Sequence, residues 1–203
     1  MKTLIAIFLF SISLSFSQDK DSLRLETLKS DYLKEFLKQQ KLLQQKEQES
    51  LQRLLQNELP NFSLPLLNGG NLWSETLRGK PTVINFWNSN CQACIDETPT
   101  LNELKKQYGG QVNFIAITFD SKKEVLDFLS DVPFHYTHII EAKAYTQQLS
   151  FWRYPKTFVL DADLIIRYIG KPEASKSLKE EIKKHTQFKK EIENVLNDFL
   201  FID

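Results

Sequence analysis

The sequence is poor in cysteine and has no excess of charge of either sign. Two of its 203 residues are cysteines, and 26 basic side chains balance 26 acidic ones. Two cysteines cannot form the several bridges of a disulfide-dense secreted scaffold, and they also exclude a four-cysteine zinc site. Because no long block of lysine or arginine stands out, a phosphate-binding surface is not indicated, and nucleic acid is not expected as a partner.

The sequence also lacks an apolar run long enough to span a bilayer. The run from Leu4 to Phe16 contains 13 residues and is interrupted only by serines, whereas a membrane-spanning helix needs about 20. Lys2 precedes this run, and Ser15 and Ser17 place small residues where a signal peptidase reads them. Residues 1–17 therefore predict a signal peptide cleaved after Ser17, with an uncleaved membrane anchor as the alternative. We expect an exported protein of the periplasm or cell envelope, an oxidising compartment.

Glycine and proline are absent from the first 59 residues. Residues 18–59 consist mostly of Leu, Lys, Glu and Gln, which are good helix formers, and they predict a helical extension. Apolar side chains recur there at helical spacing, but seven polar residues at 44–50 interrupt the stripe, so a long heptad coiled coil is not predicted. Three interpretations stay open: amphipathic helices packed on the domain surface, a dimerisation or partner-docking arm, and a disordered spacer.

From residue 60 to residue 203 the sequence alternates between short strands and helices. Residues 82–87 form an apolar run that is typical of a buried strand, and further strands are expected at 62–64, 112–119, 135–140, 157–160 and 164–169. Helices are expected after Cys94 through Tyr108, at 122–130, at 142–149 and in the tail after residue 175. This order predicts an α/β domain over residues 60–203 that closes with an amphipathic helix.

Cys91 and Cys94 form a C-x-x-C motif between the buried strand and the helix that follows it. The unpaired N–H groups and the positive dipole end of the helix N-terminus favour the thiolate form at Cys91. Cys94 lies one turn further into the helix, near enough to attack a mixed disulfide that forms on Cys91. We therefore predict dithiol exchange, with Cys91 as the attacking thiolate and Cys94 as the resolving thiol.

Three other interpretations of the two cysteines stay open. They could form a purely structural disulfide, although closing a four-residue loop removes little chain entropy. With His135 or His138 as a further ligand, they could bind copper. Cys91 could also be a peroxide-reducing thiol, although the usual polar threonine is missing before the helix start.

Five short motifs follow one another in the second part of the chain. They are Phe62-Ser63-Leu64-Pro65, Gly79-Lys80, Asn85-Phe86-Trp87, Cys91-x-x-Cys94-x-x-Glu97-x-Pro99 and Tyr154-Pro155-x-Thr157-Phe158-x-Leu160-Asp161. In this order they resemble the TlpA/ResA branch of the thioredoxin superfamily, a set of exported thiol-disulfide oxidoreductases. The resemblance covers about half of the chain and leaves residues 18–59 outside. It implies a thioredoxin-like fold, with a central mixed sheet flanked by helices, an N-terminal helical extension and a C-terminal helix.

The resemblance also implies roles for residues on either side of the dithiol. Pro155 is expected to be cis and to face the dithiol, which leaves the backbone of Tyr154 free to pair with an extended substrate. Glu97 lies on the same helix face as Cys94. It is expected to move protons to and from that cysteine, as a partly buried carboxylate with a raised pKa could do.

Four further positions surround this set. Trp87 is expected to pack beneath the dithiol and, with Tyr154 and Asn90, to take part in substrate binding. Asn85 stands where thioredoxins proper carry an aspartate. Lys156 is expected to be a solvated lysine. Asn90 replaces the tryptophan usually found before the first cysteine, which alters the exposed rim where partners dock. The middle dipeptide Gln92-Ala93 matches neither the thioredoxin nor the DsbA pattern, so the direction of electron flow is left open.

We predict an exported thiol-disulfide oxidoreductase that uses the Cys91–Cys94 couple and no other cofactor. The expected substrates are disulfides of specific envelope proteins, and cytochrome c maturation is the context that the resemblance suggests. A membrane electron donor or acceptor is expected, and so is a dimer or a docked partner at residues 18–59. The alternative hypothesis is a redox-inert or copper-binding thioredoxin-like module that acts through its helical arm.

Overall fold

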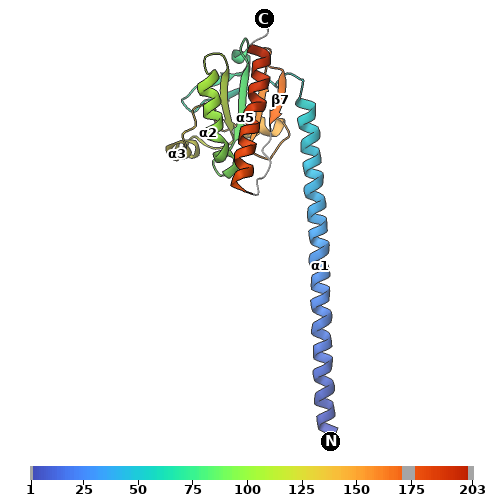
Figure 1. Cartoon of the computed structure of the whole chain (residues 1–203). Helices are drawn as coiled ribbons and strands as arrows, with labels where there is room; N and C mark the ends of the chain where they lie inside the picture. Colours follow the sequence, from blue (N-terminus) through green and yellow to red (C-terminus); the bar gives the residue numbers. More distant parts are fainter. Residues whose placement is uncertain (1, 171–176, 201–203) are drawn as a thin grey trace. The chain divides into compact units, whose positions relative to one another are not determined.

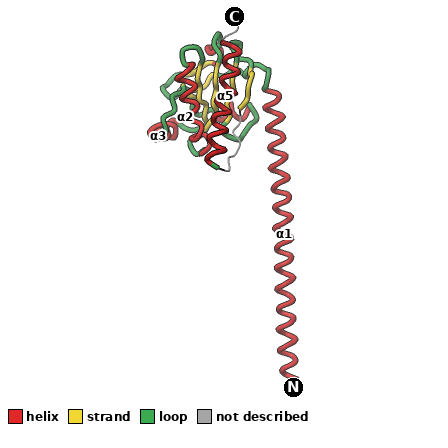
Figure 2. The backbone as a smooth tube through the Cα atoms, viewed as in Figure 1, coloured by secondary structure: helices red, strands yellow, loops and turns green. Residues whose placement is uncertain are grey.

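The central feature of the fold is a five-stranded mixed sheet (Figure 1, Figure 2). The computed structural model describes residues 2–170 and 177–200. The strands lie in the order β5 (Thr137–Ile139), β4 (Asn113–Thr118), β3 (Thr82–Trp87), β6 (Lys156–Leu160) and β7 (Ile166–Gly170). β5, β4 and β3 are parallel, whereas β6 is antiparallel to β3 and β7 is antiparallel to β6. The predicted mixed sheet is thus confirmed.

Each face of this sheet is covered by helices and has its own apolar cluster. On one face, α2 (Gln92–Tyr108), α3 (Lys122–Asp131) and α5 (Leu178–Leu200) share a cluster with Val83 and Trp87 of β3. On the other face, α4 (Lys143–Gln148) and the last turns of α1 (Lys2–Leu54) share a cluster with Ile84 and Phe86. Successive side chains of a strand point to opposite faces. Because both faces are covered, all six residues of β3 are buried, which explains its continuous apolar run.

Two smaller elements precede the sheet, and one helix closes the domain. β1 (Ser63–Pro65) and β2 (Asn71–Trp73) form an antiparallel pair, followed by the 3-10 helix η1 (Ser74–Leu77). The turn between β1 and β2 has a positive φ at Gly69 and Gly70, a conformation that glycine adopts without steric cost. The sequence predicted a strand at 62–64, close to β1, but neither β2 nor η1. The closing helix is confirmed as α5, which buries Ile192 and Leu196 completely.

The helix α1 runs without a break from Lys2 to Leu54. The chain divides into two compact units, residues 1–46 and residues 47–203. In the first unit, every side chain from 24 to 46 is exposed. The polar residues 44–50 do not interrupt the helix, since most of them are good helix formers. The second unit begins at Glu47 rather than at the boundary expected near residue 60, because Glu47 and Leu51 are both buried within it.

Residues 2–17 belong to α1, and their role as a signal peptide stays a prediction. Within residues 2–170 and 177–200, no helix combines the length and the hydropathy that crossing a membrane requires.

Candidate active site

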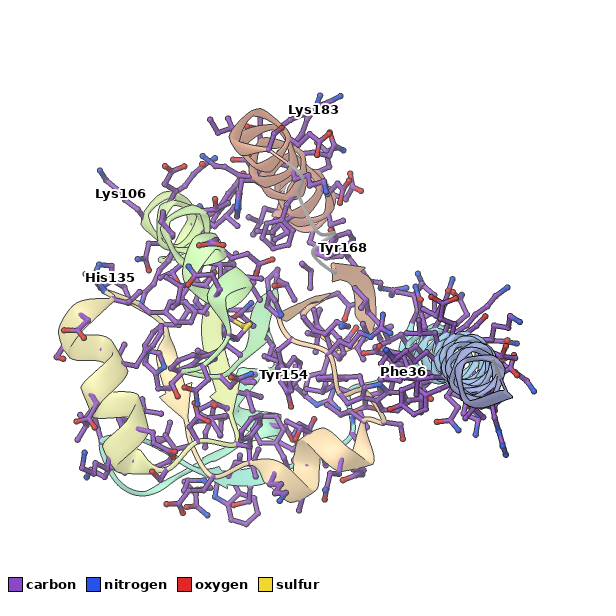
Figure 3. All side chains as sticks on the ribbon, turned by 90° about the horizontal axis from the view of Figure 1, so that it is seen from below. Phe36, Lys106, His135, Tyr154, Tyr168 and Lys183 are labelled. Atoms are coloured by element: carbon purple, nitrogen blue, oxygen red, sulfur yellow. A yellow bond between two sulfur atoms is a disulfide. The ribbon has the colours of Figure 1, made fainter. Side chains whose placement is uncertain are left out.

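The two cysteines lie where the central strand gives way to α2. After β3 ends at Trp87, a short loop leads to Cys91, which is the N-cap of α2, and Cys94 lies in the first turn of that helix. The two sulfur atoms are bonded, with the Cα atoms 5.2 Å apart (Figure 3). The backbone N–H of Cys94 donates both to the carbonyl oxygen of Cys91 at 3.0 Å and to its sulfur at 3.2 Å, so an N–H of the helix N-terminus points at that sulfur. Cys91 is half-buried, whereas Cys94 is buried. Only the first sulfur is therefore accessible to a partner.

Three loops converge on this disulfide because of the sheet topology. β3 and β4 are parallel, so the residues that follow them lie at the same edge of the sheet. β6 is antiparallel to β3, with Lys156 opposite Phe86. The Tyr154–Pro155 segment, which precedes β6, therefore lies at that edge too. Cys91 and Tyr154 pack on the same apolar cluster.

The carboxylate of Asp120, which follows β4, holds the loop that carries Cys91. The backbone N–H of Ser89 donates to Oδ2 of Asp120 at 2.6 Å, and the N–H of Asn90 donates to Oδ1 of Asn88 at 3.1 Å. Asp120 is buried, although it follows β4 at the edge of the sheet where the disulfide lies. Sequence reasoning did not single out Asp120. Its place at the carboxyl end of the strand next to β3 was the available signal.

Glu97 is buried on the inner face of α2, with a 3% exposed side chain. Its Oε2 accepts a long hydrogen bond of 3.4 Å from the amide of Asn85, and the same amide donates to the Thr157 hydroxyl at 3.0 Å. Burial raises the pKa of Glu97 to about 8, and the Asn85 hydrogen bond and the positive charge of Lys156 only partly oppose this. The buried carboxyl and its raised pKa agree with the expectation for Glu97; the proton-transfer role stays a prediction.

The peptide bond between Tyr154 and Pro155 is cis, as the resemblance implies. The ring of Tyr154 makes edge-to-face contacts with Phe119 at 5.5 Å and with Phe151 at 5.9 Å between centroids. Phe119 and Trp152 are large apolar side chains that stay exposed. Together with the half-buried Tyr154, they give this part of the domain an aromatic surface. The sequence analysis had singled out Tyr154 for its backbone but neither Phe119 nor Trp152.

Trp87 and Asn90 occupy very different surroundings. Trp87 is 1% exposed and packs against Phe128 and Phe134 in the cluster that contains Cys94. It therefore packs in the core beside Cys94, as expected, but the expected role of Trp87 in substrate binding is not supported, because its side chain does not reach the surface. Asn90 is exposed directly before Cys91, so it is placed to meet a partner.

The expectation of a solvated Lys156 is wrong. Its side chain is 4% exposed, and its ammonium lies 3.2 Å from Oε1 of Glu47 and donates to the carbonyl of Arg153 at 2.6 Å. Burial is possible because a carboxylate from the last turns of α1 supplies the opposite charge. Sequence reasoning missed this pair because its two members are far apart in the chain.

The two histidines considered as copper ligands do not join the cysteines. His138 is buried, with Nε2 lying 2.9 Å from the carbonyl of Phe134, and burial lowers its pKa. His135 is exposed on the loop before β5. In the part of the chain that the structure describes, no three His, Cys, Asp or Glu side chains are grouped to hold a metal ion.

The fold and the C-x-x-C disulfide define a thiol-disulfide oxidoreductase with a thioredoxin-like fold. The chain belongs to the AhpC/TSA family, whose model matches residues 55–169. This match covers the elements from the end of α1 to β7. Membership of the thioredoxin superfamily, predicted from the order of the motifs, is thereby confirmed.

Individual relatives agree with this assignment. The chain is 28% identical over 116 residues to the thioredoxin-like protein YneN of Bacillus subtilis (strain 168), which is 55% of this chain and 68% of the relative. It is 30% identical over 125 residues to the thiol:disulfide interchange protein DsbE of Pseudomonas fluorescens biotype C, which is 58% of this chain and 68% of the relative. Its fold is also similar to the crystal structure of the thioredoxin domain of a thiol-disulfide oxidoreductase from Bacteroides vulgatus. That match has a TM-score of 0.58 at 14% identity and covers 70% of this chain and 98% of the other.

Proposed function

We propose that the chain reduces disulfides of specific exported proteins, with Cys91 as the nucleophile. The observation that carries this proposal is the geometry of the couple: a half-buried Cys91 sulfur at the N-terminus of α2, bonded to a buried Cys94. An accessible sulfur can form a bond to a substrate. A buried partner one turn away can then displace that substrate before any other thiol does.

The reaction balances as two successive exchanges. In the reduced protein, the Cys91 thiolate attacks one sulfur of the substrate disulfide and forms a mixed disulfide, and the other substrate sulfur leaves as a thiolate that takes up a proton. Cys94 then loses its proton and attacks the sulfur of Cys91, which releases the second substrate thiol. The substrate has gained two electrons and two protons, and the protein is left with the Cys91–Cys94 disulfide seen here. An external dithiol donor must reduce it again.

Glu97 is proposed to accept the proton of Cys94. It lies one turn further along α2 and is buried like Cys94, so water is not the ready acceptor there. A carboxyl with a pKa of about 8 exchanges protons near neutral pH. The rate of the resolving step in the wild type should rise between pH 6 and pH 9, and Glu97→Gln should flatten this rise. A Glu97→Gln profile identical to that of the wild type would remove Glu97 from the mechanism.

Trapping of the intermediate tests the assignment of the two cysteines. Cys94→Ala should accumulate covalent adducts with protein substrates, visible on non-reducing gels and removed by dithiothreitol. The double variant Cys91→Ser, Cys94→Ala is the matched control and should form none. Cys91→Ser alone should abolish exchange. Adducts formed by the control, or none formed by Cys94→Ala, would contradict the assignment.

The direction of electron flow and the cellular setting form the finer part of the proposal. Export rests on the apolar segment at residues 4–16, and cytochrome c maturation is the setting suggested by the resemblance to the TlpA/ResA branch. A reductant in the envelope needs electrons from a membrane donor. Equilibration of the couple against dithiothreitol and glutathione buffers tests the direction. A potential near about −270 mV supports a reductant, and one near about −120 mV would indicate an oxidant.

We also propose that the arm, defined as residues 18–46, pairs with the arm of a second copy. Leu25, Tyr32, Phe36 and Leu43 are all exposed, by 41–71%. They are separated by seven, four and seven residues, which places them within about 40° of one another around a helix of 3.6 residues per turn. Such a continuous apolar stripe on an exposed helix is typical of a docking surface.

Antiparallel pairing follows from the order of the stripe and from the charges beside it. The spacing is the same when read from either end, so Leu25 meets Leu43 and Tyr32 meets Phe36. Residues 19–31 carry four acidic and three basic side chains, a net charge of −1, whereas residues 34–46 carry four lysines and one glutamate, a net charge of +3. Antiparallel arms bring the opposite charges together, whereas parallel arms would bring the two +3 segments together.

Cross-linking of the full chain distinguishes these arrangements. In a background with Cys91→Ser and Cys94→Ser, chains with Leu25→Cys are mixed with chains carrying Leu43→Cys and oxidised. Antiparallel pairing predicts mainly the mixed dimer, and parallel pairing predicts each variant linked to itself. Tyr32→Glu should lower the fraction of dimer in sedimentation, while Ser30→Gln, which is exposed away from the stripe and leaves the charge unchanged, should not. A monomeric wild-type chain would refute the proposal.

A further inference from the structure

A carboxylate from the last turns of α1 holds the segment that contains the cis proline. Oε1 of Glu47 accepts from the backbone N–H of Trp152 at 3.4 Å and from that of Arg153 at 3.2 Å. The ammonium of Lys156 lies 3.2 Å from the same oxygen, and Nε of Arg153 lies 3.6 Å from Oε2. We call this set, Glu47 with Arg153, Lys156 and the two backbone amides, the Glu47 clamp.

The clamp contacts the chain on both sides of Tyr154 and Pro155. Before them, two consecutive backbone amides are bound by Glu47. After them, Lys156 binds Glu47 and also donates to the carbonyl of Arg153, which closes a ring of contacts around the two residues. The Lys156 ammonium also lies 5.9 Å from the ring centroid of Phe151. Glu47 and Lys156 are both nearly excluded from solvent, so these contacts are little screened.

We propose that Glu47 is a positioning residue for substrate binding. This inference rests on the proposed function and on the expectation that the Tyr154 backbone pairs with an extended substrate. Charge-assisted hydrogen bonds are directional and short-ranged, so they fix where the backbone of this segment lies relative to Cys91. Apolar packing would stabilise the loop about as well as a buried ion pair does, but without this directional control. A shift of about 1 Å in a positioning group is enough to slow a reaction up to about 100-fold.

The inference separates Glu47 from the residues that carry out the exchange. Glu47 lies one helical turn before Leu51, which belongs to the apolar cluster on the sheet face opposite to α2, whereas Cys94 belongs to the other cluster. A change at Glu47 should therefore affect how a polypeptide substrate binds and leave the chemistry of the sulfur atoms unchanged. Small disulfides, which do not pair with the Tyr154 backbone, should be insensitive to the change.

The test compares two substrates in Glu47→Gln and in the matched control Glu49→Gln, whose side chain is exposed on the same helix. With insulin as the polypeptide disulfide, Glu47→Gln should lower kcat/KM about 10-fold, mainly through KM. With the small disulfide of Ellman's reagent, kcat/KM should stay within about 2-fold. The reduction potential should equal that of the wild type. Glu49→Gln should match the wild type in every assay.

Two outcomes would overturn the inference. Equal losses on insulin and on Ellman's reagent would show a general structural defect, and no loss on either would show that the clamp does not position the loop. If Glu47→Gln does not fold, Glu47→Asp keeps the charge but moves the carboxylate, and it should show the same substrate split. A wild-type chain that exchanges no disulfide at all would refute the proposed function instead, so the two failures are distinguishable.

Discussion

Two buried glutamates, one near each face of the central sheet, have opposite surroundings. On the face covered by α2, Glu97 receives a single long hydrogen bond from a neutral amide. On the other face, Glu47 is contacted by two backbone amides and by the cations of Arg153 and Lys156. The first carboxyl has the raised pKa of a group that holds its proton. The second forms ion pairs with both cations and accepts hydrogen bonds from both amides.

This difference shows that burial alone does not decide what a carboxyl does. Because the charge of Lys156 only partly opposes the effect of burial, Glu97 can exchange a proton near neutral pH, which suits the chemistry of a thiol beside it. With two cations and two amides, Glu47 becomes a fixed anchor for a loop. Substitutions that treat both residues alike should therefore have different effects.

The largest effect is expected from removing the anchor. Glu47→Ala leaves the Lys156 ammonium buried without its carboxylate, and breaking one side of a buried pair lowers the free energy of unfolding by about 3 kcal/mol or more. Urea denaturation of the oxidised protein measures this. Glu49→Ala, on the exposed side of α1, should change the same quantity by less than about 0.5 kcal/mol. Equal values for the two variants would show that the ion pair does not contribute.

A second effect, which depends on pH, is expected for Glu97→Gln. The pKa of Glu97 in the folded protein is about 8, above its ordinary value of 4.5. Below pH 4.5 the carboxyl is protonated in both states, and no penalty arises. As the pH rises from 4.5 to 8, only the unfolded state releases the proton, so wild-type stability falls. Glutamine carries no such proton. The variant should match the wild type at pH 4 and be the more stable of the two at pH 9.

Denaturation at both pH values provides this measurement. The difference between the variant and the wild type isolates Glu97 from the other titrating groups. A difference that stays constant between pH 4 and pH 9 would show that Glu97 titrates near its ordinary pKa in the folded protein.

The smallest effect is expected at the exposed edge of the clamp. Arg153 is 43% exposed and its Nε lies 3.6 Å from Glu47, so water screens this interaction. Arg153→Gln should lower the free energy of unfolding by no more than about 0.5 kcal/mol. A loss as large as that of Glu47→Ala would make Arg153, rather than Lys156, the main cation of the clamp.

Much of the domain could be predicted from the sequence because its signals are local. The buried strand at 82–87 is a continuous apolar run, the turn before α2 carries C-x-x-C, and Tyr154-Pro155 precedes a strand. Each of these signals occupies only a few consecutive residues. Their order along the chain added the topology, since it matched a known thioredoxin-like pattern.

What could not be predicted depends on contacts between distant residues. From the sequence, Lys156 is expected to be a surface lysine. Only the folded structure brings Glu47, which is far from it in the chain, beside its ammonium. Asp120 reads as a loop aspartate until the parallel pairing of β3 and β4 places it against the N–H of Ser89. The partners of Lys156 and of Asp120 cannot be identified from the sequence, because no local pattern indicates which distant residues will be in contact. The start of the compact unit at Glu47 escaped prediction for the same reason.

The bond between the only two cysteines of the chain also sets its capacity as an electron carrier. One chain stores a single pair of reducing equivalents or none, with no third thiol to divert them into a wrong internal bridge. After each reduction of a substrate, an electron donor must reduce the Cys91–Cys94 disulfide once. Donor and substrate therefore react alternately with the same sulfur. The number of free thiols per chain therefore gives directly the fraction of chains that are reduced.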